Sequence, residues 1–370
     1  MNIPFVSFEY MHKPLKASMM QAFEDFYDSS WYILGDRVKK FESEYSFYNK
    51  VGFTVGVSNG LDAIFLSLKA LGIGPGDEVI VPSNTYIATW LAIEYTGAKI
   101  VPVEPCLNTY NIDVKIIESL ISNSTKAILP VHLYGQACDM TTICTIAKKY
   151  GLYVIEDNAQ SQGAIWDNQL TGSFGDVNAT SFYPGKNLGA LGDAGAITTN
   201  SAILNEKIRA LRNYGSVVKY QNDIIGYNMR LDECQAAFLS VKIKYLDTWI
   251  TQRRQIAKWY NKALSGIGDI IIPEIAKNAS HVYHLYVIRT KYRDKLSAYL
   301  NGLQIGTLIH YPIPPHLQKG FSHLKLIKGS LPITEELSNT CLSLPIWPGL
   351  KESDVEYVAD SIKKFFQNEL

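Results

Sequence analysis

The stretch VGFTVGVSNGLDAIFLSLKALGIGPGDEVIVPS, residues 51–83, contains one strand–helix–strand unit of the fold that this sequence predicts. Residues 51–60 read as a strand that ends in a turn, and residues 61–72 place apolar side chains at the three-to-four spacing of an amphipathic helix. Residues 74–83 supply a loop and a second strand. A strand, a helix and a strand in this order are typical of a parallel sheet covered by helices.

The same alternation continues to about residue 200. We therefore predict an α/β fold with a mixed, mostly parallel sheet that carries helices on both faces. Ligands of such sheets bind at the carboxyl ends of the strands. Further helices are expected at 86–97 and 139–149, and further strands at 98–104, 125–135, 150–159, 178–185 and 194–199.

The pattern changes after a long helical tract at 231–264. The last hundred or so residues predict a smaller C-terminal α+β domain, because strands and helices no longer alternate regularly there. The expected elements are a strand at 281–290, a helix near 293–301, a proline-rich loop at 310–318 and a helix near 353–366. We divide the chain into 1–245, an N-terminal arm with the large domain, and 246–370, a linking helix with the small domain.

The composition narrows the class of protein. With 370 residues, 47% of them hydrophobic, the chain can bury two cores. Its formal net charge of zero argues against nucleic acid or a membrane surface as the main partner. Five scattered cysteines form no C-x-x-C pair and show no metal-ligand spacing, so we expect free thiols and no metal. Because we find no signal peptide or membrane-spanning run, we expect a cytoplasmic protein.

Four features follow expected strands at one edge of the sheet. Lys186 stands in the glycine-rich stretch SFYPGKNLGALGDAGA, residues 181–196, and Asp157 follows an apolar strand in VIEDNAQSQGA. The turn VSNGLDA, residues 57–63, leads into a helix and could cradle a phosphate, and Tyr86 begins the next helix. Taken singly, these features also fit a solvated lysine, a helix cap and an ordinary turn. Together they match pyridoxal phosphate, which requires a Schiff-base lysine and an acid opposite its ring nitrogen.

The chain resembles the DegT/DnrJ/EryC1/StrS family of PLP-dependent sugar aminotransferases, which belongs to the aspartate aminotransferase superfamily of fold type I. The resemblance implies the PLP-dependent transferase fold and the cofactor pyridoxal 5'-phosphate, with pyridoxamine phosphate formed during turnover. The motifs that carry it run in order over nearly the whole chain: GVSNGLDAIFLSLKALGIGPGDEVIVPSNTYIATWLAI, PVHLYGQ, VIEDNAQSQGA, SFYPGKNLGALGDAGAI, LRNYGS, GYNMRLDECQAA, VYHLYVIR and HYPIPPHLQ.

By motif position, Lys186 resembles the family's Schiff-base lysine and Asp157 its acid at the pyridine nitrogen. Asn228 resembles an asparagine that reaches the cofactor phosphate from a neighbouring subunit, which implies a homodimer with shared active sites. Many members have Ser-Gly-Thr in the phosphate turn, whereas this chain has Asn-Gly-Leu, so backbone amides must bind more of the phosphate. The remaining residues of the implied cofactor site are Asn59, Gly60, Leu61, Tyr86, Gln160 and Ser181.

The resemblance also implies the reaction. The chain is most similar to members that move the amino group of L-glutamate to carbon 3 of a dTDP-linked 3-keto-6-deoxyhexose, releasing 2-oxoglutarate and a dTDP-3-amino-3,6-dideoxyhexose. A carbon-4 aminotransferase, an enzyme acting on an inositol-type ketone and a non-catalytic regulatory member are the alternatives. Lys186 argues against the family's dehydratases, which carry histidine there. Tyr183 favours carbon 3. The expected substrate-binding residues are Tyr183, Tyr214, Lys219, Arg230, His310, Tyr311 and His316, whereas His12, His132, His281, His284 and His323 are read as structural.

Overall fold

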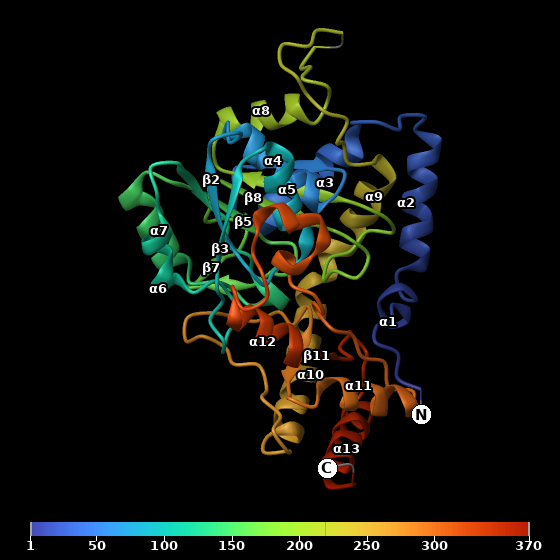
Figure 1. Cartoon of the computed structure of the whole chain (residues 1–370). Helices are drawn as coiled ribbons and strands as arrows, with labels where there is room; N and C mark the ends of the chain where they lie inside the picture. Colours follow the sequence, from blue (N-terminus) through green and yellow to red (C-terminus); the bar gives the residue numbers. More distant parts are fainter. Residues whose placement is uncertain (1, 219, 369–370) are drawn as a thin grey trace.

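The computed structural model describes residues 2–218 and 220–368. Its large domain is built on one sheet in which β9 runs antiparallel to both neighbours, β1 and β8, and all other neighbouring strands are parallel. The predicted mixed, mostly parallel sheet is therefore confirmed (Figure 1). In order across the sheet, the strands are β1 (Phe53–Val57), β9 (Gly195–Thr199), β8 (Val177–Ser181), β5 (Tyr153–Asp157), β4 (Thr125–Ile128), β2 (Glu78–Pro82) and β3 (Lys99–Val103).

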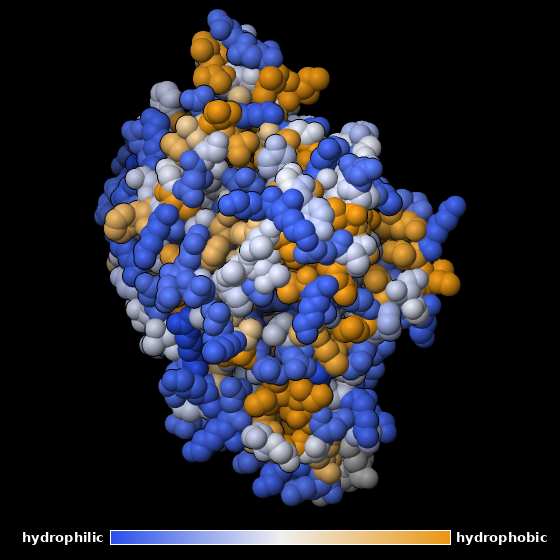
Figure 2. Space-filling view, turned by 90° about the vertical axis from the view of Figure 1, so that its left-hand side faces the viewer, coloured by the Kyte–Doolittle hydropathy of each residue, from blue (hydrophilic) through white to orange (hydrophobic). Residues whose placement is uncertain are grey.

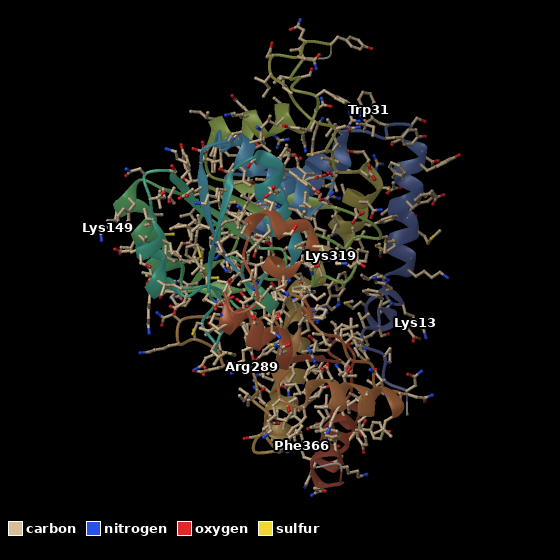
Figure 3. All side chains as sticks on the ribbon, viewed as in Figure 1. Lys13, Trp31, Lys149, Arg289, Lys319 and Phe366 are labelled. Carbon is tan, nitrogen blue, oxygen red and sulfur yellow. The ribbon has the colours of Figure 1, made fainter. Side chains whose placement is uncertain are left out.

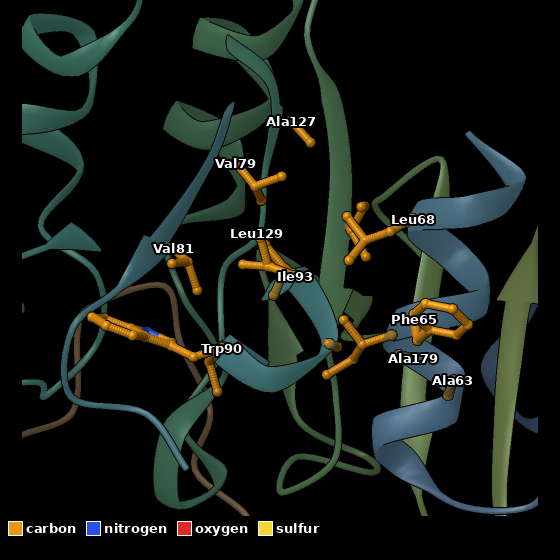
Figure 4. Close-up of a cluster of buried hydrophobic side chains, with 14 of the residues drawn as sticks. Ala63, Phe65, Leu68, Val79, Val81, Trp90, Ile93, Ala127, Leu129 and Ala179 are labelled. Atoms are coloured by element: carbon orange, nitrogen blue, oxygen red, sulfur yellow. The ribbon is translucent and has the colours of Figure 1, made fainter. Parts of the chain in front are cut away.

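Helices cover both faces of this sheet, because alternate strand residues point to opposite sides. Val79 and Val81 pack in a core with α4 (Gly60–Ala70), α5 (Ile87–Thr96) and α8 (Ala202–Leu211). Figure 4 shows that core, with Val79 and Val81 near Ile93 of α5. Ile80, between them, belongs to the second core, which includes side chains of α3 (Asp36–Asn49), α7 (Met140–Tyr150) and α9 (Glu233–Lys242). All three strand residues are fully buried, which stabilises the fold by about 1.5–3 kcal/mol for each side chain.

The small domain lies below the large sheet in Figure 1. Its two strands, β10 (Tyr286–Arg289) and β11 (Cys341–Leu344), pair antiparallel. Arg289, labelled in Figure 3, links the domains: its guanidinium lies 5.9 Å from the Tyr110 ring and 3.2 Å from a carboxylate oxygen of Glu336. The helices of this part are α10 (Leu246–Leu264), α11 (Arg293–Gly302), α12 (Pro332–Thr340) and α13 (Glu352–Asn368).

The helical tract expected at 231–264 is not one helix. A 3₁₀ turn at Ile243–Tyr245 separates α9 from α10, although a single periodic pattern runs through this part of the sequence. The strand expected at 281–290 is also shorter, because His284 and Leu285, just before Tyr286, form a loop that lines a large cavity. The domain boundary at 245/246 stays a prediction.

The N-terminal arm joins both domains. Ile3 pairs with Ile305 of the small domain, and α2 (Lys16–Asp28) packs along α9 of the large domain (Figure 1). Within the described residues, no helix has the length and apolar character needed to cross a bilayer. The remaining short elements are α1 (Glu9–His12), α6 (Val114–Ile117), β6 (Ile165–Trp166), β7 (Gln169–Leu170) and 3₁₀ turns at Glu118–Leu120, Leu133–Gly135, Pro315–Leu317 and Lys319–Leu324.

Candidate active site

A cavity of about 770 Å³ opens at the carboxyl ends of the parallel strands. The turns after β1, β2, β5 and β8 line it, which is the expected ligand position in such a sheet. The fold therefore brings segments from distant parts of the sequence into one site. The predicted residues that line the cavity are Asn59, Gly60, Leu61, Tyr86, Asp157, Gln160, Ser181, Tyr183, Lys186, His310 and Tyr311.

The turn from β1 into α4 forms an anion cradle. Asn59 caps the helix: its side-chain oxygen accepts from the amide of Asp62 at 2.9 Å, so that oxygen is already engaged. The amides of Gly60 and Leu61, in the first turn, have no acceptor within the helix. A Cβ on Gly60 would lie 2.6 Å from the Cβ of Ser181, so only glycine allows this close approach. Two free amides at a helix N-terminus suit a phosphate.

Asp157 ends β5 and is only 5% exposed. One carboxylate oxygen accepts from the Thr89 hydroxyl at 2.9 Å, and the other accepts from the Ala159 amide at 3.1 Å. Burial raises the pKa of Asp157, while these two donors and the charge of Lys186 oppose that shift. Because both oxygens are held, the carboxyl group has a fixed orientation toward the cavity that it lines.

A buried pair supports Asp157 from behind. The amide of His132 donates to the Asp157 carbonyl at 3.2 Å, and His132 Nε2 lies 2.8 Å from Glu156. The Cys138 amide donates to His132 Nδ1, so Nε2 carries the hydrogen and donates to Glu156. Glu156 also accepts from the Gly172 amide at 2.7 Å. His132 is thus structural, as the sequence indicated, and fixes the end of β5.

Lys186 lies in the loop after β8 and lines the same cavity. Burial lowers the pKa of its amine to about 8, although the charge of Asp157 acts in the opposite direction. At pH 7.5 about a quarter of such an amine is neutral, against about one part in a thousand for an ordinary lysine. The position therefore suits a lysine that must act as a nucleophile or a base.

Aromatic and imidazole rings form the opposite wall. Tyr86 is the N-cap residue of α5, and its ring lies 5.3 Å from the ring of Tyr311. Gln160 donates to the Tyr311 hydroxyl at 3.1 Å and accepts from the Tyr134 amide at 2.7 Å. His310 Nδ1 lies 2.8 Å from the Ser343 hydroxyl, and burial with the nearby charge of Lys186 lowers its pKa to about 4. The His310 imidazole is therefore neutral at physiological pH.

Among the residues that the structure describes, four predicted ones do not line this cavity. His316 is buried beside Glu335, with 3.1 Å between its Nε2 and the carboxylate. The other three, Tyr214, Asn228 and Arg230, lie in the segment 212–230, which projects from the top of the molecule in Figure 1. There the Arg230 guanidinium lies 5.3 Å from the centre of the Tyr214 ring, and Asn228 pairs with Asn213; Lys219 is outside the described residues.

Sequence reasoning missed several polar and aromatic residues of the cavity, among them Phe5, Thr89, Arg253 and His284. Thr89 follows Tyr86 by one helical turn, and this spacing could have revealed it. Phe5 stacks on His310 at 5.8 Å, a contact that only the tertiary fold makes. His284 was expected to be purely structural but lines the cavity, where burial holds its pKa well below the usual value.

Comparison with known proteins identifies the family of the chain. The model of the DegT/DnrJ/EryC1/StrS aminotransferase family matches residues 14–363. The chain belongs to this family. The resemblance stated from the motifs and the prediction of an aminotransferase are thereby confirmed.

Individual members of the family cover the whole chain. It is 49% identical to the dTDP-3-amino-3,6-dideoxy-alpha-D-galactopyranose transaminase of Aneurinibacillus thermoaerophilus over 98% of this chain and 99% of that one. It is 44% identical to the "Pleiotropic regulatory protein" of Geobacillus stearothermophilus over the full length of both. The crystal structure of S. venezuelae DesV in complex with a ketimine intermediate superposes with a TM-score of 0.97 at 42% identity and covers 99% of each chain.

Proposed function

We propose that this aminotransferase uses pyridoxal phosphate to move the amino group of L-glutamate to carbon 3 of a dTDP-linked 3-keto-6-deoxyhexose. The observation that carries the proposal is one cavity lined by a lysine with a lowered pKa, a fixed buried carboxyl group and a helix N-terminus with free amides. The product is a dTDP-3-amino-3,6-dideoxyhexose.

The residues fit the cofactor. The amides of Gly60 and Leu61 suit its phosphate, and Ser181 packs closely enough on Gly60 to close that side of the cradle. Asp157 suits its protonated ring nitrogen, because the carboxylate already accepts from Thr89 and lies in a buried setting where a charge pair is strong. When bound, pyridoxal phosphate supplies a conjugated electron sink for charge that develops on the amino-acid α-carbon.

The chain's own side chains position the reactants and move the proton. Lys186 would hold the cofactor covalently, and its neutral amine would carry the proton to and from the reacting carbon. The low pKa of this amine makes the neutral form available at physiological pH. Neutral His310 can donate or accept one hydrogen bond to the substrate without competing with Lys186 for a charge.

Replacing Lys186 tests the assignment directly. We expect both Lys186→Ala and Lys186→Arg to lose turnover by at least about a thousandfold, because neither can form and exchange the covalent link. The arginine variant is the sharper one, since it keeps the positive charge. Measurable turnover in either variant, within tenfold of the wild type, contradicts the assignment.

The choice of carbon 3 is supported by the name of the relative from Aneurinibacillus and by Tyr183, whose side chain lines the cavity three residues before Lys186. The alternative is amination at carbon 4. Incubation with L-glutamate and either dTDP-linked 3-keto or 4-keto 6-deoxyhexoses separates the two, with the aminated carbon assigned by NMR. Amination at carbon 4 alone overturns the proposal.

A regulatory role is the second candidate, because one relative is named a pleiotropic regulatory protein. A binding module needs no proton-transfer lysine. We therefore expect glutamate to change the visible absorbance of the holoenzyme stoichiometrically and to yield 2-oxoglutarate. An unchanged spectrum at saturating glutamate favours the regulatory reading.

We also propose a homodimer in which Asn228 of one subunit reaches the phosphate held by the other. Two observations support it: Asn228 does not line the cavity of its own chain, and the tip of the segment 212–230 exposes apolar side chains. Val217 is 75% and Ile225 88% exposed, and apolar residues colour this projecting tip in Figure 2. Such an exposed apolar group is typical of a surface that a partner covers.

Mixed dimers test the shared site. Lys186→Ala and Asn228→Ala are each expected to have little activity as homodimers. Reassembled from an equimolar mixture, half the dimers are mixed and each has one intact site, so about a quarter of wild-type activity returns. No recovery means that Asn228 acts within its own chain, and a fully active Asn228→Ala homodimer means that it has no role in the site.

A further inference from the structure

Backbone hydrogen bonds within the loop that carries Lys186 hold its shape. The Lys186 amide donates to the Tyr183 carbonyl at 2.8 Å, and the Ala190 amide donates to the Phe182 carbonyl at 2.7 Å. Gly189 packs so tightly that a Cβ there would come within 2.3 Å of the Pro184 carbonyl oxygen. The position of Gly189 therefore sets the shape of the loop around Lys186.

Helix α9 holds this loop from behind at two points. The Nζ of Lys242 donates to the Gly189 carbonyl, and the side-chain oxygen of Gln235 accepts from the Leu191 amide at 2.8 Å. The Lys242 ammonium also lies 3.3 Å from His12 Nε2 in the N-terminal arm. Residues from both ends of α9 therefore bind the loop, since Gln235 is in the first turn of the helix and Lys242 is its last residue.

The helix itself is a fixed support. The carboxylate of Glu233 accepts from the amides of Gly35 at 2.6 Å and of Arg37 and Val38 at 3.1 Å, which are donors at the start of α3. These bonds satisfy amides that α3 cannot satisfy internally. Because α9 is tied to α3 and packs against α2, a tether from α9 transmits little motion to the loop.

Lys242 is an unusual residue for a purely structural position. It is 2% exposed, and among the described residues no carboxylate lies within ion-pair distance of its ammonium. Burial without a counter-charge lowers its pKa to about 8. An apolar side chain of similar length would fill the same space without this desolvation. What the ammonium adds is a strong donor to one carbonyl, three residues after Lys186.

We propose that Lys242 is a positioning residue, which through Gly189 fixes the loop that aims Lys186 into the cavity, with Gln235 as a second, weaker tether. The proposal rests on the proposed role of Lys186 in catalysis. The contact with His12 makes the N-terminal arm part of the same support.

Hydrogen exchange of the full-length holoenzyme tests the tether without relying on activity. In Lys242→Met, which keeps the chain length but loses the donor, we expect the amides of residues 182–191 to exchange at least about tenfold faster. Exchange in β4, β5 and α7 should stay unchanged. The matched control is Lys244→Met, because Lys244 is exposed two residues further along the chain. Unchanged exchange in 182–191, or equally faster exchange throughout the chain, overturns the proposal.

Kinetics and a second variant complete the test. We expect kcat of Lys242→Met to fall about tenfold or more with KM for glutamate changed less than about twofold, since positioning acts on the proton-transfer step. If Lys242→Met does not fold, Gln235→Leu tests the proposal instead. We then expect faster exchange in residues 182–191 only, and unchanged exchange there overturns the proposal. If the wild type is inactive with every sugar, the proposed function fails. The hydrogen-exchange result still tests whether Lys242 fixes the loop through Gly189.

Discussion

Thr89→Val is a sensitive test of how the carboxyl group of Asp157 is kept ionised. The substitution preserves the shape of the side chain and removes the hydroxyl that donates to Asp157 at 2.9 Å. A hydrogen bond to a charged group contributes about 1.5–3 kcal/mol. At 1.36 kcal/mol for each pKa unit, its loss raises the pKa of Asp157, already raised by burial, by about one to two further units.

The assay is the pH dependence of kcat/KM for glutamate. The proposed function requires the ionised carboxylate opposite the ring nitrogen, so the acidic limb of the profile should move upward by about one to two pH units in Thr89→Val. Thr85→Val is the matched control: the Thr85 hydroxyl bonds that of Thr89 at 2.8 Å but does not contact Asp157. An acidic limb in Thr89→Val that coincides with that of Thr85→Val refutes the reasoning.

Three further outcomes are expected from the geometry. Gly60→Ala should weaken pyridoxal phosphate binding about tenfold or more in an equilibrium titration, because the added Cβ would lie 2.6 Å from Ser181. Gly74→Ala is the control and should bind the cofactor normally, because its Cβ would lie 3.6 Å from the nearest atom, a carbonyl oxygen. Wild-type kcat should rise with pH through about 8, as Lys186 loses its proton; a flat profile from pH 7 to 9 contradicts its role as base. The pKa of Lys242 is lower in the folded than in the unfolded protein, so the unfolded state binds more protons between about pH 8 and 10.5. In denaturant unfolding, the free energy of unfolding of the wild type should therefore rise by about 3 kcal/mol relative to Lys242→Met across that window. A difference that stays constant with pH excludes the shifted pKa.

Local patterns were enough to predict the sheet and the strand-end residues that line the cavity. Alternating strands and helices imply parallel strands with their carboxyl ends at one edge, and the residues just after those strands therefore had to converge. Lys186, Asp157 and the turn at Asn59 met in one cavity for this reason. The break between α9 and α10 was not predictable in this way, because the apolar spacing continues through Ile243–Tyr245.

The sequence alone therefore determined the fold class, the family and the strand-end residues of the site, since each depends on local periodicity or on a contiguous motif. Only the tertiary structure decided which loops close the cavity. It brought Phe5 against His310, set Thr89 on Asp157 and placed Lys242 under Gly189, while leaving His316 outside. These contacts join residues that are far apart in the sequence, and burial, which sets the pKa values of Lys186 and Lys242, is a property of the packed chain and not of any segment within it.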